Sequence, residues 1–360
     1  MTGVDPDVVV VGGGIAGAAA AWALSRAGAR VVLVEQEAQP GHHATGRSAA
    51  VTNETVGHPV VCALARASRP FLDAPPAGFV DHPLLSPRGL LWVAEDPASL
   101  DDLAASARRI GPEEVQQLVP QLRPAWAAAG GVYEAEARSV DVAALLQGYL
   151  RGLDVRTGAA VAQLARVGDG WRVEVGGSVL RCGVVVNAAG AWGDVVASRA
   201  GVAPLGLAPL RRTACLVAVP DGDDVGGWPL VMDAGGGFYA EPESGGLLLS
   251  PADETPSPPG DARPEELDVA LALDRLRDAT TLPVRSVRRA WAGLRTFTSD
   301  RIPVAGFDPD APGFYWLVGQ GGAGIKTAPA LAALAAADIT GTPVALPADL
   351  VAAVRPARLR

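Results

Sequence analysis

The sequence predicts an α/β fold that opens with a parallel βαβ unit, and three features of its first 35 residues support this prediction. Valines 8–11 form a run of β-branched residues, which indicates a strand buried on both faces. The alanine-rich run 18–24, closed by Gly28, indicates a helix. Residues 31–35 indicate a second strand, so the elements follow one another as in a doubly wound sheet.

A glycine-rich turn joins the first strand to the helix. Gly12, Gly14 and Gly17 match the spacing G-x-G-x-x-G. The first glycine of this motif allows a tight turn, the second lets the backbone approach a pyrophosphate, and the third lets the helix pack on the strand. Glu35 ends the second strand, where a carboxylate can accept hydrogen bonds from a ribose. We therefore predict a dinucleotide site rather than a purely structural unit, although this motif does not choose between NAD and FAD.

Composition and charge exclude several classes of protein. The chain has 360 residues, 49% of them hydrophobic, which is enough for two domains or one large one. A net charge of -9 and a pI near 5.0 argue against nucleic acid or an anionic membrane as the main partner. The start lacks the basic segment of a signal peptide, and glycines interrupt the apolar stretch 8–24. We expect a cytoplasmic protein without a transmembrane segment.

The cysteines and histidines predict neither a redox-active disulfide nor a metal site. The sequence contains no C-x-x-C pair, and the histidines show no metal-ligand or catalytic-triad spacing. We expect the thiols to be buried. The residues concerned are Cys62, Cys182, Cys215, His42, His43, His58 and His82.

A polar segment, 40–50, directly follows the second strand and is punctuated by glycines, and it can open a helix at Ser48. Its backbone amides, Thr45 and Ser48 lie where they can reach a bound cofactor, with an ordinary connection as the alternative.

The rest of the chain mixes helical and strand patterns. Expected helices cover 59–72, 98–110, 112–119, the segment from a cap at 139–141 to residue 150, 264–280, and the segment after Gly324 to about residue 339. Expected strands cover 88–94, 131–134, a meander over 154–187 that leads into 184–192, a strand-rich block over 206–255, and 314–318.

Taken in order, five stretches resemble the D-amino-acid oxidase superfamily of flavoenzymes, and within it most closely the FAD-dependent D-arginine dehydrogenases. These stretches are 12–17 with Glu35, 43–48, 187–192, 291–295 and 319–327. The resemblance implies a Rossmann-like FAD-binding domain of the glutathione-reductase type and a substrate domain built on a mixed or antiparallel sheet. It divides the chain into a discontinuous FAD-binding domain, 1–80, 140–205 and 300–360, and a substrate domain, 81–139 and 206–299.

The resemblance also implies a set of site residues. Arg212, Tyr239 and Arg295 would hold the substrate carboxylate, which the planar fork of arginine matches; two surface arginines are the alternative. Gly322 is a further implied catalytic residue. Lys326 would lie near the pyrimidine end of the flavin. As an alternative to non-covalent binding, the flavin would be attached covalently to His43. The implied cofactor residues are Gly12, Gly14, Ile15, Ala16, Gly17, Glu35, Gln36, Thr45, Gly46, Arg47, Ser48, Val161, Asn187, Ala188, Ala189, Gly190, Trp192, Gly293, Arg295, Gly321, Gly322, Gly324, Ile325, Lys326 and Thr327.

Three positions depart from the arginine enzymes. Val51 and Val56 replace a histidine and a tyrosine, and Leu90 replaces the glutamate that recognises the guanidinium. We therefore predict an FAD-dependent oxidoreductase that oxidises the α-C–N bond of a D-amino acid with an apolar or uncharged side chain, giving a 2-oxo acid and ammonia. The electron acceptor would be oxygen or a quinone. The alternatives are a glycine or sarcosine oxidase-like enzyme acting on a secondary amine, and a flavin-binding protein without amine chemistry.

Overall fold

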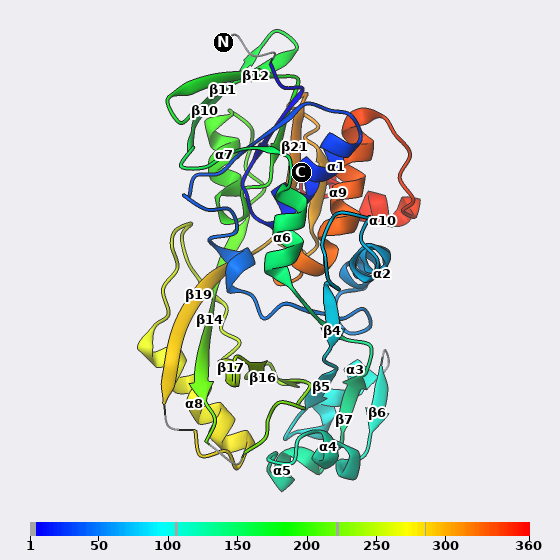
Figure 1. The fold of residues 1–360 in the computed structure, drawn as a ribbon, viewed down its shortest axis with the longest axis vertical. Helices are drawn as coiled ribbons and strands as arrows, with labels where there is room; N and C mark the ends of the chain where they lie inside the picture. Colours follow the sequence, from blue (N-terminus) through cyan, green and yellow to red (C-terminus); the bar gives the residue numbers. More distant parts are fainter. Residues whose placement is uncertain (1–4, 105–106, 221–222, 285) are drawn as a thin grey trace.

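The computed structural model describes residues 5–104, 107–220, 223–284 and 286–360. Two β-sheets dominate it, one in each of two lobes that follow one another along the long axis of the molecule (Figure 1). The upper lobe of this view holds a six-stranded sheet and the chain's C-terminal end, and the lower lobe holds a nine-stranded sheet. This arrangement confirms the predicted α/β fold with a second sheet.

The six-stranded sheet has the strand order β20-β21-β13-β1-β2-β9. Neighbouring strands are parallel except β20 and β21, which are antiparallel. All four residues of β1 are buried, because layers of structure cover both faces of the sheet, as the run of valines predicts. The strands are β1 (Val8–Val11), β2 (Val31–Val34), β9 (Asp154–Arg156), β13 (Val184–Asn187), β20 (Val304–Phe307) and β21 (Phe314–Val318).

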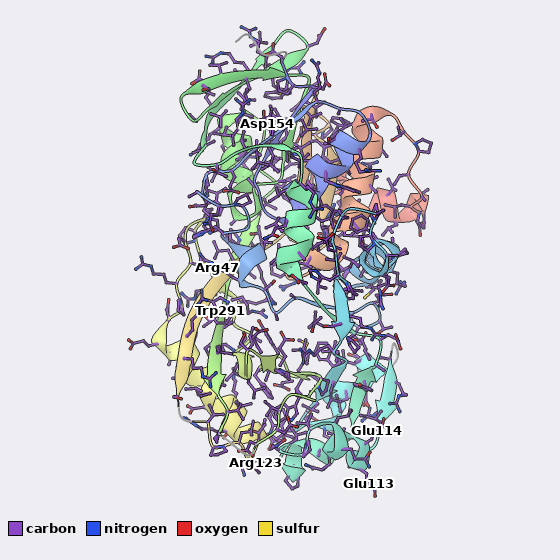
Figure 2. The ribbon with its side chains drawn as sticks, viewed as in Figure 1. Arg47, Glu113, Glu114, Arg123, Asp154 and Trp291 are labelled. Atoms are coloured by element: carbon purple, nitrogen blue, oxygen red, sulfur yellow. The ribbon has the colours of Figure 1, made fainter. Side chains whose placement is uncertain are left out.

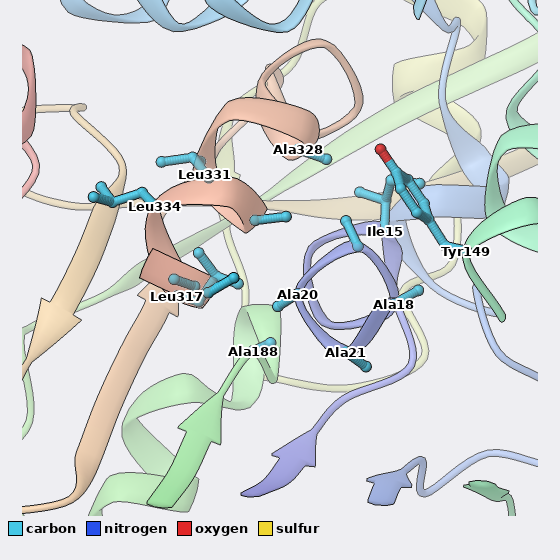
Figure 3. Close-up of a cluster of buried hydrophobic side chains, with 14 of the residues drawn as sticks. Ile15, Ala18, Ala20, Ala21, Tyr149, Ala188, Leu317, Ala328, Leu331 and Leu334 are labelled. Atoms are coloured by element: carbon cyan, nitrogen blue, oxygen red, sulfur yellow. The ribbon is translucent and has the colours of Figure 1, made fainter. Parts of the chain in front are cut away.

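Helices cover one face of this sheet, and small side chains let two of them pack closely. Figure 3 shows Ala18, Ala20 and Ala21 of α1 buried in one cluster with Leu331 and Leu334 of α9. An alanine occupies little space between two helix axes, so both backbones can approach each other and the sheet. The helices that contribute to this cluster are α1 (Ile15–Arg26), α2 (Pro59–Asp73), α6 (Val142–Leu150), α9 (Gly324–Thr340) and α10 (Ala348–Ala353).

The predicted meander covers the other face of the six-stranded sheet. It forms a separate antiparallel sheet of three strands, and its alternate side chains, among them Trp171 and Val173, pack on the sheet together with α7 (Gly193–Arg199). The strands of this sheet are β10 (Val161–Val167), β11 (Gly170–Val175) and β12 (Ser178–Cys182).

The nine-stranded sheet forms the lower lobe. Its strand order is β18-β14-β17-β16-β15-β5-β7-β6, with β19 paired to β14, and α8 (Glu266–Ala279) packs against β14 and β17. All neighbouring pairs are antiparallel except β15 with β5. The strands are β5 (Leu90–Val93), β6 (Arg108–Ile110), β7 (Gly131–Glu134), β14 (Ala208–Ala218), β15 (Leu230–Asp233), β16 (Tyr239–Glu243), β17 (Gly246–Ser250), β18 (Thr255–Pro256) and β19 (Val287–Phe297).

Three local expectations were wrong. Residues 154–156, expected to begin the meander, form β9, which pairs in parallel with β2 at the edge of the six-stranded sheet. The predicted helix over 98–110 is a short helical segment, 97–104, followed by β6, which pairs with β7; residues 105–106 lie outside the described part of the chain. The pairing of β6 with β7 is a non-local contact that a helical periodicity does not report. Ser48 does not open a helix, because it ends a 3₁₀ turn, Ala44–Arg47, and its backbone is extended.

Short elements complete the fold. A small sheet in the order β3-β8-β4 lies between the lobes, and the remaining helices are one or two turns long. These elements are β3 (Val51–Thr52), β4 (Leu85–Pro87), β8 (Arg138–Val140), α3 (Asp101–Ala104), α4 (Pro112–Leu118), α5 (Pro124–Ala127) and the 3₁₀ turns Pro97–Leu100, Gly190–Trp192 and Pro356–Leu359. Within the described ranges, no helix combines the length and the apolar character that crossing a membrane requires.

Candidate active site

The glycine turn after β1 brings three backbone segments close together. Gly12 has φ of 106°, and a Cβ there would lie 2.5 Å from Ala188 O. A Cβ at Gly17 would overlap Gly12 O, so α1 packs directly on the turn. Only glycine fits at these two positions, which explains the spacing in physical terms. The N-terminus of α1 consequently faces a cavity of about 170 Å³, here called the first cavity.

Glu35 lies at the end of β2 beside this turn. Its side chain is only 8% exposed, and its carboxylate accepts hydrogen bonds from Gly13 N at 2.6 Å and Glu37 N at 2.8 Å. Thr45 accepts a hydrogen bond from Ile15 N at 3.0 Å, so the 3₁₀ turn is tied to the first turn of α1. Both side chains line the first cavity and are held in place by backbone amides before any ligand binds.

The first cavity brings together most of the predicted cofactor residues. They come from the glycine turn after β1, α1, the two residues after β2, the 3₁₀ turn at 44–47, β10, the segment after β13, β19, and the glycine-rich segment up to the start of α9. Those that line it are Gly12, Gly14, Ile15, Ala16, Glu35, Gln36, Thr45, Arg47, Val161, Ala188, Ala189, Gly190, Trp192, Gly293, Gly321 and Gly324.

Four predicted cofactor residues line neither cavity of the site. Gly17 and Gly46 let the backbone pass close to Gly12 O and Gly41 O, respectively. Asn187 is fully buried, and its amide donates to Gly193 O at 2.8 Å. Thr327 is also fully buried and donates to Ala323 O at 2.9 Å. The structure thus places these four residues behind the wall of the first cavity, where they fix its loops.

Two buried polar atoms of the first cavity are left without a partner. Thr296 Oγ1 and Gln320 Nε2 make no hydrogen bond with any described residue. Buried polar groups are normally satisfied, so these two atoms fit a polar ligand in the cavity. Glu35 and the N-terminal amides of α1 lie together at the glycine turn, and Thr296 and Gln320 come from β19 and the segment before α9, so the lining fits a dinucleotide. The sequence analysis missed both residues, although Gln320 stands within the glycine-rich segment that drew attention.

A second cavity of about 280 Å³ adjoins the first and shares part of its wall. The shared residues are Ile15, Ala44, Thr45, Arg47, Gly293, Leu294, Gly321 and Gly324. Among the predicted site residues, those that line only the second cavity are Ser48, Arg212, Tyr239, Arg295, Gly322, Ile325 and Lys326. The two cavities are therefore adjacent, and their ligands would meet at these shared residues.

Arg212, Tyr239 and Arg295 converge on one side of the second cavity. Arg295 Nη2 donates to the Tyr239 hydroxyl at 3.3 Å, and both guanidinium groups lie within 6 Å of the Tyr239 ring centroid. Burial, together with the nearby Arg295 charge, lowers the pKa of Arg212 from its ordinary value. A Cβ at Gly322 would lie 3.1 Å from Arg295 Nη1, so the Gly322 backbone approaches that guanidinium closely. Two cations and a hydroxyl thus meet where a carboxylate fits.

The loop after β17 holds Arg212 in position. Arg212 Nε donates to Asp253 O at 2.7 Å, and its Nη2 donates to Glu254 Oε1 at 3.2 Å. Neither Asp253 nor Glu254 lines the second cavity. These contacts leave the guanidinium face that looks toward Tyr239 available for a ligand.

Apolar side chains form the opposite part of the wall. Val51, Val56 and Leu90, the three positions that depart from the arginine enzymes, all line the second cavity. Trp92, Leu230 and Met232, which the sequence analysis did not single out, line it as well. Glu54 is absent from this wall, because Arg69 Nη1 binds its carboxylate at 2.8 Å.

Arg47 connects the two lobes at the site. Its guanidinium donates to Ala292 O at 2.8 Å and Ala262 O at 3.0 Å, and it forms an ion pair of 2.5 Å with Asp261. In return, Trp291 Nε1 donates to Arg47 O at 3.3 Å. Figure 2 shows Arg47 and Trp291 next to each other where the lobes meet. These contacts fix the shared wall of the two cavities to β19.

Residues 37–43 contain a cluster that sequence spacing did not reveal. Glu37, His42 and His43 place possible metal-ligand atoms within 4.8 Å of one another. His43 Nε2 already bonds to Glu37 Oε1 at 2.9 Å, and the Arg47 guanidinium lies 3.3 Å from His42 Nε2. A cation beside a potential ligand nitrogen opposes metal binding, so these contacts are those of a hydrogen-bonded loop.

A family model described as FAD dependent oxidoreductase (DAO) matches residues 7–338. The chain belongs to this family of FAD-dependent oxidoreductases. Family members are flavoproteins, so the cofactor of this oxidoreductase is FAD, in agreement with the dinucleotide fit of the first cavity.

A curated relative of this FAD-dependent oxidoreductase is the tRNA 5-methylaminomethyl-2-thiouridine biosynthesis bifunctional protein MnmC of Polaromonas sp. (strain JS666). It is 30% identical over 389 residues, which cover 97% of this chain and 59% of the relative. The chain therefore spans well under two thirds of the length of that protein.

Solved structures of other flavoenzymes share the fold of this oxidoreductase. L-proline dehydrogenase from P. horikoshii has a TM-score of 0.83 at 20% identity and covers 98% of this chain and 97% of its own. Glycine oxidase from Geobacillus kaustophilus has a TM-score of 0.80 at 23% identity and covers 96% of this chain and 97% of its own. At these identities the likeness establishes the fold.

Proposed function

We propose that this oxidoreductase oxidises the α-C–N bond of an amine that carries a carboxylate, in the simplest case an amino acid. The observation that carries this proposal is the convergence of Arg212, Tyr239 and Arg295 in the second cavity, beside the wall that it shares with the first. Arginine forks match the two oxygens of a carboxylate, and the tyrosine hydroxyl adds a further donor.

Each group of residues has a distinct task in the proposed reaction. FAD, when bound, supplies the hydride acceptor. Arg295 and Arg212 bind the carboxylate and thereby orient the α-C–H bond toward the shared wall, while the apolar wall around Leu90 excludes water. No aspartate, glutamate or histidine is among the described lining residues of the second cavity. An amine that binds neutral needs no base there, since its own lone pair forms the C=N bond as the hydride leaves.

The first candidate substrate is a D-amino acid with an apolar or uncharged side chain. Val51, Val56 and Leu90 offer such a side chain apolar contacts and offer a cationic one no acidic partner. The imine product would be hydrolysed to a 2-oxo acid and ammonia, and oxygen or a quinone would reoxidise the flavin.

A secondary amine is the second candidate. The product named for the MnmC relative contains a methylaminomethyl group, which is a secondary amine, and glycine oxidase shares the fold. The absence of acidic lining residues suits a secondary amine as well as a primary one, because both need the carboxylate site and a neutral nitrogen.

Anaerobic reduction of the purified yellow protein tests the proposal. D-amino acids and N-methylglycine would be added in turn, and bleaching of the flavin absorbance would be followed by stopped-flow. Faster bleaching by D-amino acids supports the first candidate, and faster bleaching by N-methylglycine supports the second. If no carboxylate-bearing amine bleaches the flavin, the chain binds flavin without amine chemistry.

A further inference from the structure

The strand pairing of β14 is interrupted beside Arg212. On one side of this strand, pairing with β18 ends at Arg211 and pairing with β17 begins only at Cys215. The residues that join β17 to β18, 251–254, belong to neither strand. A buried main-chain N–H without a partner strand needs another acceptor. For Thr213 N, that acceptor is a side chain of this joining segment.

The carboxylate of Asp253 takes the place of the missing strand. Its Oδ1 accepts a hydrogen bond from Thr213 N at 2.7 Å, and its Oδ2 lies within hydrogen-bonding distance, 3.1 Å, of Thr213 Oγ1. The side chain of Asp253 is only 8% exposed, and Arg211 Nε lies 3.8 Å from its Oδ2. One buried carboxylate thus fastens the segment 251–254 to the strand residue that follows Arg212.

The main chain of the same residue contacts Arg212. Asp253 O accepts a hydrogen bond from Arg212 Nε at 2.7 Å, so Asp253 holds two consecutive residues of β14. Glu254 Oε1 accepts hydrogen bonds from Arg212 Nη2 at 3.2 Å and from Arg301 Nη2 at 2.7 Å. Within the described ranges, Arg212 Nη1 has no hydrogen-bond partner, and Asp253 does not line the second cavity. Asp253 therefore acts from behind the cavity wall.

The segment 251–254 is held in a strained conformation. Ala252 has φ of 56°, a left-handed backbone that residues other than glycine rarely adopt. Its N–H donates to the hydroxyl of the fully buried Ser250 at 3.1 Å. Such a conformation persists only where the surrounding contacts impose it. The contacts of Asp253 follow directly in the chain, so the segment should relax when the Asp253 carboxylate is removed.

We infer that Asp253 is a positioning residue, whose carboxylate fixes the segment 251–254 on β14 and thereby orients the Arg212 guanidinium toward the second cavity. The inference rests on the proposed function, in which Arg212 binds the substrate carboxylate. A guanidinium fork binds a carboxylate well only when the two groups are aligned. If the segment relaxes, Asp253 O leaves Arg212 Nε, and the guanidinium loses its alignment.

Binding of an inert carboxylate measures this alignment without turnover. In (methylthio)acetate, sulfur replaces the nitrogen of N-methylglycine, and its Kd for the FAD-loaded protein would be measured from the change in flavin absorbance. Asp253→Ala should raise the Kd about 10-fold, because Arg212 then forms a weaker charge-assisted bond. Asp253→Asn keeps an acceptor for Thr213 N and should stay within about 3-fold of the wild type. Asp278→Ala, at an exposed position of α8, is the control and should not change the Kd.

A double variant shows whether Asp253 acts through Arg212. In the Arg212→Met background, Asp253→Ala should have no further effect on the Kd, since the group that it positions is gone. If Asp253→Ala does not fold, Asp253→Glu is the second variant. It keeps the charge beside Arg211, but its extra methylene displaces the segment, so the Kd should again rise while FAD is retained.

Three results would overturn the inference. They are a wild-type Kd in Asp253→Ala, a wild-type Kd in Asp253→Glu, and an equal rise in Kd when Asp253→Ala is introduced into the wild type and into Arg212→Met. A different result marks the failure of the proposed function. If the wild type does not bind (methylthio)acetate, or Arg212→Met binds it as tightly as the wild type, Arg212 does not bind the carboxylate and the assignment of Asp253 fails with it.

Discussion

The two cavities of the site are built in different ways. The first is lined in part by glycines such as Gly12, Gly14 and Gly321, which leave main-chain atoms accessible to a ligand. The second takes its character from side chains that several distant segments contribute, among them Leu90 and Arg295. Substitutions can therefore change which substrate the second cavity accepts while the first continues to bind FAD. The comparison implies that cofactor binding and substrate choice respond to different mutations.

The largest expected effect is discrimination against cationic side chains. A substrate cation would lose water and find no acidic partner on the wall formed by Val51, Val56 and Leu90. This penalty is on the order of 3–5 kcal/mol, which corresponds to a few hundredfold or more in kcat/KM. D-Leucine, D-methionine or D-phenylalanine should outperform D-arginine and D-lysine in steady-state assays at one pH with an artificial acceptor. If D-arginine has the highest kcat/KM of these substrates, the prediction is wrong, and Glu54 must leave Arg69 and enter the cavity.

The second-largest expected effect is a loss of substrate binding, without a loss of FAD, when a site arginine is replaced. Arg295→Met and Arg212→Met should each cost about 2–5 kcal/mol of transition-state binding, because the carboxylate loses a charge-assisted partner in a desolvated site. Both variants should retain a full complement of FAD, measured by absorbance after desalting. Arg289→Met, at an exposed position of the same strand as Arg295, is the control and should keep its kcat/KM. Near-normal kinetics in both site variants would contradict the carboxylate assignment.

A substitution of Gly17 should have the opposite result, because it should reduce FAD binding. A methyl group at Gly17 would overlap Gly12 O, so Gly17→Ala should cost about 1–3 kcal/mol of stability and displace α1 from the turn. We expect a lower Tm and a reduced FAD-to-protein ratio. Gly227→Ala, where an added methyl meets nothing within 4 Å, is the matched control. Normal FAD content in Gly17→Ala would show that the first cavity tolerates backbone displacement.

The smallest expected effect concerns a buried acid of the nine-stranded sheet. Glu241, on β16 like Tyr239, is 3% exposed, and burial raises its pKa to about 8 against the opposing effect of Arg88. The folded state therefore binds this proton more tightly than the unfolded chain, and the free energy of unfolding falls as pH rises from the ordinary glutamate pKa toward 8. Glu241→Gln should stabilise the protein by about 1–2 kcal/mol at pH 9 and very little at pH 5.

Thermal unfolding at the two pH values checks this prediction. Glu243→Gln, at an exposed position of the same strand, should change the Tm little at either pH. A stabilisation of Glu241→Gln that is equal at pH 5 and pH 9 would show that the carboxyl group does not titrate in this range.

Local sequence patterns were sufficient for the part of the first cavity that the glycine turn and Glu35 form. The valine strand, the glycine turn and Glu35 lie within 35 residues, so their contacts follow from short-range geometry. Patterns were insufficient where distant segments pair: residues 108–110 form a strand only because β7 lies beside them. Ser48, which was expected to open a helix, follows a 3₁₀ turn instead, and the hydroxyl of Thr45 in that turn accepts a hydrogen bond from Ile15 N at the start of α1.

The second cavity could be predicted only through the family resemblance. Arg212, Tyr239 and Arg295 come from three separate strands, and no spacing in the sequence relates them. Asn53, which holds Lys326, and Trp92 and Met232 of the apolar wall carry no local signal at all. The division of the chain into an FAD-binding and a substrate domain at 80, 139, 205 and 299 stays a prediction.

The central claim is that Arg212, Tyr239 and Arg295 bind the carboxylate of an amine that reduces the flavin. Anaerobic stopped-flow reduction by one bleaching amino acid, compared with its carboxamide, tests this claim most directly, since the amide keeps the amine and the side chain but loses the negative charge. We predict that the acid bleaches the flavin at least about 100-fold faster than the amide at subsaturating concentration, as expected for the loss of a charge-assisted pair. Equal rates for the acid and the amide would contradict the claim.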